Sequence, residues 1–201
     1  MIRPFHLVLL AALLIAFWLT DPFSSSPPPV EAPRVSVPLD RNQPIQNNLA
    51  EPSRVRVNDY QLTLLAEFSI DARVLGREDY RLGREADLSP WDFALGWGEM
   101  ARSEVAEQFD IRQSGRWYYW RAERLSIPRR VVETSSANMH LIPANEAIRE
   151  QLDRMGKDDQ LRLRGFLVEA SAEDGWRWRS SMSRTDTGNG ACEVILVTEV
   201  L

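Results

Sequence analysis

Few side chains in this sequence could carry covalent chemistry, and most of them lie towards its C-terminal end. Cys192 is the only cysteine, and His140 is one of two histidines. A thiol becomes a nucleophile when a neighbouring histidine or cation lowers its pKa. These residue types therefore allow a cysteine hydrolase with Cys192 as nucleophile and His140 as base, in which Asn138 or Glu193 orients the histidine.

The same residues also have a structural interpretation. Cys192 begins an apolar run, where a small buried thiol is common. His140 stands between Met139 and Leu141, as a packed and hydrogen-bonded histidine would. The two histidines and one cysteine do not form a spaced set of metal ligands. We therefore predict no metal and no cofactor, and we favour a non-enzymatic protein over the hydrolase.

The segment 176–193 has the densest polar chemistry and offers binding candidates. Asp186-Thr187-Gly188 matches the triplet of aspartic proteases, but it follows Arg184-Thr185 and not an apolar strand. A turn in which Asp186 bonds to its own backbone explains the triplet better. We predict Arg184 and Asp186 as binding residues.

The aromatic residues are a third possible site. Aromatic platforms can line a groove for a glycan or a peptide, although indoles at alternate strand positions more commonly belong to a core. We expect Trp176 and Trp178 inside, and Trp97 and Trp120 at the rim of a binding groove.

Composition excludes some functions before any fold is considered. The chain has 201 residues, of which 44% are hydrophobic and 26% charged, so it can form a globular core. Its net charge of -5 and its lack of a basic block argue against a nucleic-acid partner.

The N-terminal part has the pattern of an export signal. Arg3 precedes an unbroken apolar run from Leu7 to Leu19. Because no Ala-x-Ala site follows, we predict for residues 1–23 an uncleaved anchor, with a cleaved signal as the alternative. The span 5–23 would cross the inner membrane, with the N-terminus in the cytoplasm and the rest of the chain periplasmic or otherwise extracytoplasmic.

A proline- and serine-rich segment follows the apolar run. Residues 24–53 contain Ser24-Ser25-Ser26-Pro27-Pro28-Pro29 and four further prolines. Such composition predicts an extended, disordered linker that separates a domain from the membrane. The part from Pro38 to Pro44 could instead dock as a strand.

Residues 54–201 are predicted to form one extracytoplasmic domain. Period-two alternation predicts strands over 60–64 and 68–74, with a change of face at Leu65-Ala66. Further strands are expected at 113–121, 131–134, 137–142, 161–168, 176–180 and 192–197. Helices are expected at 91–97 after Ser89-Pro90, at 103–109, and from the cap Asn145 to Met155. The hairpin signal is Asp174-Gly175.

With about seven strands and no alternation of strands and helices, the predicted class is α+β. We expect a mostly antiparallel sheet, or a small and partly closed β-barrel, with two or three short helices.

Several motifs of this domain together resemble a family of bacterial exported, membrane-anchored proteins without an established activity. The resemblance is carried by Leu95-Gly96-Trp97-Gly98, by Ser136-Ala137-Asn138-Met139-His140 and by the segment 180–193. It implies an envelope location and no particular reaction. The expected function is a membrane-tethered domain that binds an envelope protein or glycan, and the alternative is the Cys/His hydrolase.

Overall fold

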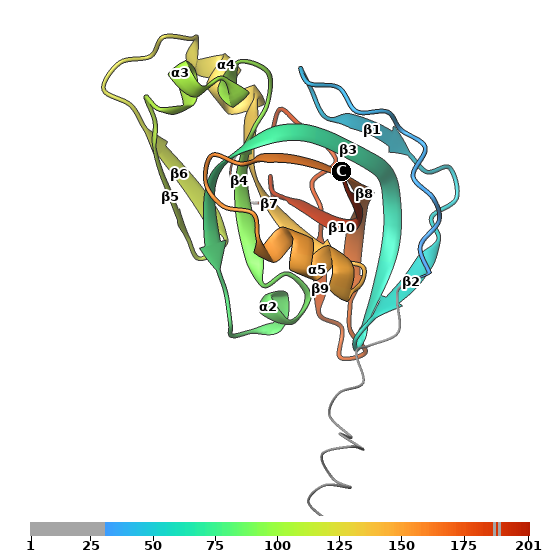
Figure 1. Cartoon of the computed structure of the whole chain (residues 1–201). Coiled ribbons are helices and arrows are strands. Elements are labelled where there is room, and N and C mark those ends of the chain that lie inside the picture. The colour runs from blue at the N-terminus through green and yellow to red at the C-terminus, as the bar shows by residue number, and fades with distance from the viewer. Residues whose placement is uncertain (1–30, 187, 189) are drawn as a thin grey trace, which may run out of the picture.

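The computed structural model describes residues 31–186, 188 and 190–201, and in them eight strands form a main sheet while two others form a hairpin beside it (Figure 1). The strands are β1 (Ile45–Asn48), β2 (Arg54–Val57), β3 (Tyr60–Asp79), β4 (Trp91–Gly96), β5 (Asp110–Ser114), β6 (Trp117–Arg121), β7 (Ser136–Pro143), β8 (Gln160–Ser171), β9 (Arg177–Arg179) and β10 (Glu193–Val200). The helices are α2 (Arg84–Leu88), α3 (Ser103–Ala106), α4 (Arg129–Thr134), α5 (Glu146–Asp153) and the 3-10 helix η1 (Gly98–Ala101).

The long strand β3 organises the main sheet. It pairs with β8 through 61–73 and with β4 through 73–79, and the order continues from β4 to β7, β10 and back to β8. All of these pairs are antiparallel except β7 with β10. The mostly antiparallel sheet is thus confirmed, but its closure is ring-like and does not make a barrel. The described chain also has four short α-helices, not two or three.

A bulge in β3 sends one run of apolar residues into two cores. The register with β8 shifts between Leu64 and Ala66, which confirms the predicted change of face. Even-numbered residues before the bulge, such as Leu62, pack in a cluster that includes Trp178 of β9 and Val55 of β2. Even-numbered residues after it, such as Phe68, pack with α5 and the inside of the ring.

Three predicted elements are wrong, and one of them is the strand 113–121, which a turn at Gly115 and Arg116 divides into the antiparallel strands β5 and β6. Residues 91–96 form strand β4 and not a helix, because Ser89 does not cap: its hydroxyl donates to the Trp91 carbonyl at 2.7 Å. All six residues of β4 are buried, so the run has no alternation of buried and exposed positions that would separate a strand from a helix. The predicted strand 131–134 belongs to helix α4, whose first turn forms where Val131 donates to the Pro128 carbonyl.

Other local predictions are confirmed. Asn145 caps α5 by accepting from the Ile148 N–H at 3.0 Å. Asp174-Gly175 turns β8 into β9, with Gly175 at φ 90°. Helix α3 lies within the predicted 103–109.

Residues 31–53 of the predicted linker lie against the domain. Strand β1 pairs with β3 over Ala66 to Ser69. Upstream, the Ser36 N–H and hydroxyl both donate to the Glu67 carboxylate at 2.8 Å, and Val37 is buried. The predicted anchor 1–23 lies outside the described residues, and no helix within the described part is long and apolar enough to cross a membrane.

Candidate functional site

A network of polar side chains surrounds the buried carboxylate of Asp92. Strand β4 places it opposite His140 on β7, and its Oδ1 lies 2.7 Å from His140 Nδ1. Arg116 Nη1 donates to the same oxygen at 2.5 Å, and Asn138 Nδ2 donates to Oδ2 at 3.1 Å. Burial alone would raise the pKa of Asp92, but the hydrogen bond and charge of His140 and the charge of Arg116 outweigh it and lower the pKa. Asp92 is therefore a charged anchor inside the protein.

Arg116 reaches Asp92 from the turn of the β5–β6 hairpin. Gly115 and Arg116 both have left-handed φ, 59° and 71°, as a two-residue hairpin turn requires. The Arg116 guanidinium lies 3.9 Å from the centre of the Tyr80 ring and donates to the Ser89 carbonyl at 3.0 Å. The hairpin is thus held on the main sheet by its own tip.

Asp92 and Arg116 were not among the residues predicted from the sequence. Asp92 lay within a predicted helix, so its position opposite His140 could not be seen. The signals that could have identified them are a single acidic residue inside an apolar run and the Gly-Arg pair directly before the aromatic-rich segment 117–120.

His140 is a packed histidine, as its sequence context indicated. It is 2% exposed, one ring nitrogen is bonded to Asp92, and its ring lies 4.8 Å from that of Trp178. No hydrogen bond joins His140 to Cys192 among the described residues.

Cys192 lies beside Asn138, because β10 and β7 run parallel with Glu193 opposite Met139. Its thiol donates to the Arg116 carbonyl at 3.8 Å. Burial, followed by the negative charges of Glu193 and Asp92, raises the pKa of the thiol to about 12. The segments 138–140 and 192–193 are therefore neighbours in space, but the Cys192 thiol is protonated.

A cleft of about 400 Å³, here called the aromatic cleft, opens next to this network. Strand β6 provides Trp117, Tyr118 and Trp120. The other wall comes from α4, the start of β7 and the segment before β10, and consists of Arg129, Glu133, Ser136, Ala137, Asn138, Asp186, Gly188, Ala191 and Cys192.

The walls of the aromatic cleft are held by specific contacts. The Tyr118 hydroxyl lies 2.9 Å from Ser136 Oγ. The Arg129 guanidinium lies 5.0 Å from the centre of the Trp120 ring and pairs with Glu133 at 2.7 Å. Trp117 is 37% exposed, so its indole remains available to a ligand.

The predicted binding residues divide into two groups. Trp120 and Asp186 line the aromatic cleft, where Asp186 accepts from the Ser181 hydroxyl at 2.7 Å. Arg184 does not line it and pairs with buried Glu193 at 3.0 Å. Trp97 is 3% exposed within the core, so the rim position expected for it is wrong.

The Arg184–Glu193 pair is incompletely bonded. Arg184 Nη1 lies 3.0 Å from Glu193 Oε1 but does not form a hydrogen bond with it. Arg184 Nε and Glu193 Oε2 are also buried without a hydrogen-bond partner among the described residues. Burial raises the pKa of Glu193 to about 7 and lowers the pKa of Arg184.

No group of three or more histidine, cysteine or acidic side chains in the described part of the chain is arranged to hold a metal ion. Comparisons with protein-family models, curated proteins and solved structures find no match to this chain. The site is therefore interpreted from its own geometry.

Proposed function

We propose that the chain is a membrane-tethered envelope domain that binds a glycan in the aromatic cleft and catalyses no reaction. The observation that carries this proposal is the composition of the cleft. Three aromatic side chains of β6 stand beside the carboxylates of Glu133 and Asp186. Ring faces cover the apolar faces of sugars, and carboxylate or amide groups bond their hydroxyls, so the two kinds of wall suit a saccharide.

The state of the polar groups supports binding over catalysis. A hydrolase using Cys192, His140 and Asn138 needs a thiolate with a base in hydrogen-bond reach. Here the pKa of Cys192 is raised and not lowered, and no hydrogen bond joins its thiol to His140 among the described residues. Asn138 is engaged by Asp92, Arg116 and Gln113, which makes it a support for the cleft wall.

The test compares two aromatic residues of the same strand. Trp117 lines the cleft, whereas Tyr119 is 58% exposed and does not line it. We expect Trp117→Ala to weaken the binding of cell-wall glycan fragments, followed by tryptophan fluorescence, by about tenfold or more. Tyr119→Ala should leave the affinity unchanged.

Equal effects of the two substitutions would contradict the glycan proposal. A pull-down from the envelope gives the other distinguishing result. If Trp117→Ala abolishes capture of a protein while glycan binding is absent in every variant, the ligand of the cleft is a protein and not a glycan.

A further inference from the structure

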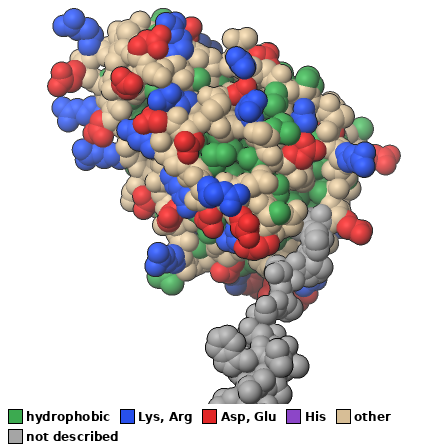
Figure 2. Space-filling model, viewed as in Figure 1, with side chains coloured by type: hydrophobic (Ala, Val, Ile, Leu, Met, Phe, Trp, Pro, Cys, Tyr) green, Lys and Arg blue, Asp and Glu red, His purple; other side chains and the backbone are tan. Residues whose placement is uncertain are grey.

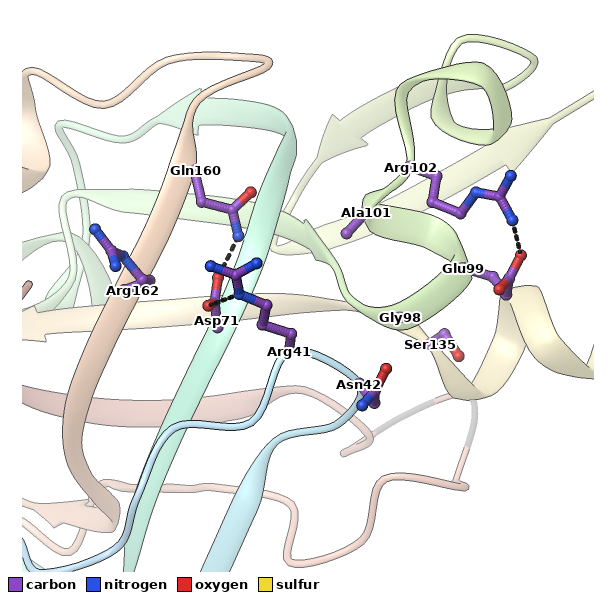
Figure 3. A pocket seen from close by; sticks show the side chains of 10 residues that line it. All are labelled: Arg41, Asn42, Asp71, Gly98, Glu99, Ala101, Arg102, Ser135, Gln160 and Arg162. Carbon is purple, nitrogen blue, oxygen red and sulfur yellow. Dashed lines mark hydrogen bonds and ion pairs between the residues drawn. The ribbon is translucent and has the colours of Figure 1, made fainter.

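A second and larger pocket lies away from the aromatic cleft. Its volume is about 820 Å³, within the range of about 300 to 1,000 Å³ that small-molecule sites occupy. We call it the arginine pocket, and Figure 3 shows its lining: Arg41, Asn42, Asp71, Gly98, Glu99, Ala101, Arg102, Ser135, Gln160 and Arg162. It contains no aromatic residue, so it must recognise a ligand by charge and hydrogen bonds.

The wall formed by the segment 36–42 is fixed in place. The Ser69 hydroxyl donates to the Pro38 carbonyl at 2.5 Å, and the Gly98 N–H donates to the Arg41 carbonyl at 3.2 Å. Gly98 has a φ of 53°, and a Cβ there would lie 3.0 Å from the Asn42 carbonyl oxygen. The pocket therefore exists before any ligand arrives, and two residues of the predicted linker, Arg41 and Asn42, form part of it.

Three guanidinium groups and two carboxylates line the arginine pocket, and they differ in how far they are neutralised. Arg102 is bonded to Glu99 at 3.0 Å and to Glu104 at 2.6 Å, on the side of the pocket away from Arg162 (Figure 3). The buried Asp71 accepts from Gln160 and lies 3.7 Å from Arg41 Nε. The carboxylate of Asp71 thus accepts a hydrogen bond from Gln160 and has only a longer contact with the Arg41 guanidinium.

Two of the arginines keep donors for a ligand. The Arg41 side chain is 88% exposed, and its 3.7 Å contact with Asp71 is too long to occupy all of its N–H groups. Arg162 is exposed on β8 and makes no ion pair among the described residues. Elsewhere, basic and acidic side chains are interspersed on the surface, as Figure 2 shows for one face. An anionic ligand would therefore be recognised in the arginine pocket through Arg41 and Arg162.

We propose that the arginine pocket binds a saccharide unit that carries a carboxylate or a phosphate group. Arg41 and Arg162 bind the anion, because planar guanidinium groups match carboxylate and phosphate oxygens. Asn42, Ser135 and Gln160 bond the hydroxyls, which explains a pocket much larger than a bare anion needs. This site is independent of the aromatic cleft.

Titration calorimetry on the full-length chain in a detergent without a sugar head group tests the proposal. The ligands are glucuronate, glucose 6-phosphate, inorganic phosphate and glucose. We expect the two anionic sugars to bind, with an affinity that falls as salt screens the charges, and glucose not to bind. The anionic sugar with the higher affinity shows whether the pocket prefers a carboxylate or a phosphate. The difference in affinity between glucose 6-phosphate and inorganic phosphate shows how much the sugar contributes to binding.

Single-charge variants decide which arginines are responsible. Arg162→Gln and Arg41→Gln should each weaken binding about tenfold or more, because each removes charged hydrogen bonds. Arg124→Gln makes the same change of charge at an exposed residue outside the pocket and should have no effect. Equal loss in the Arg124 variant, equal binding of glucose, or no binding at millimolar concentration would overturn the proposal. A thermal unfolding curve for each variant separates loss of binding from loss of fold.

Discussion

Labelling of Cys192 tests directly whether the polar network could support catalysis. Because the chain has one cysteine, the labelling rate reports on a single position. Burial and nearby carboxylates raise the pKa of this thiol from 9.0 to about 12. At pH 8 this shift lowers the thiolate fraction about a thousandfold, and the thiolate is the form that reacts.

The assay compares the native chain with the same chain in concentrated urea. We expect iodoacetamide at pH 8 to label the native thiol about a thousand times more slowly than the unfolded thiol. Cys192→Ser should show no labelling, as the control for the single labelled position. Native labelling within a few fold of the unfolded rate would mean an accessible thiolate. That result would refute the structural role given to Cys192 and would favour the hydrolase.

Three further predictions concern the elements that support the site. Burial raises the pKa of Glu193 from 4.5 to about 7, so between these values the folded chain binds more protons than the unfolded chain. Its free energy of unfolding should fall by about 3 kcal/mol as pH rises through this window, and urea curves of Glu193→Gln should lack that dependence. Gly165→Ala would place a Cβ 2.0 Å from the Leu196 carbonyl oxygen. We expect a loss of about 1 to 3 kcal/mol in urea unfolding, and an unchanged midpoint would contradict the packing of β8 on β10. Arg116→Ala leaves Asp92 buried without its guanidinium, which should cost about 3 to 5 kcal/mol. Hydrogen exchange of the β5–β6 hairpin should rise in this variant and less in Arg116→Lys.

Local signals predicted much of the fold because they act over a few residues. The Asn145 cap, the Asp174-Gly175 turn and the change of face in β3 each depend on neighbours in sequence. The segment 91–96 failed for the opposite reason. Its six residues are buried between β3 and β7, so their conformation is decided by strands distant in sequence. The helix-start signal of Ser89-Pro90 was weaker than the pairing of this segment with β3 and β7.

The site was predictable only where it depends on residue type. Cys192, Asn138 and His140 were recognised as possible chemistry, and the parallel pairing of β10 with β7 confirms that their segments are neighbours. Periodicity contains no information about which strands pair, so neither Asp92 opposite His140 nor the burial of Trp97 could be derived from it. The wall that 36–42 gives to the arginine pocket was hidden by a composition typical of linkers.

The conformation of Arg116 links the buried network to the aromatic cleft. A non-glycine residue with left-handed φ costs about 1 to 2 kcal/mol, and Arg116 has a φ of 71°. The ion pair with Asp92 and the contact with Tyr80 offset this cost only while the hairpin stays on the sheet. The Arg116 carbonyl also accepts from Asn138 and Cys192 in the facing wall. One residue therefore fixes both sides of the cleft, so a ligand that displaced β6 would have to break buried bonds to Asp92. A cleft held in this way is suited to binding a rigid ligand without changing shape.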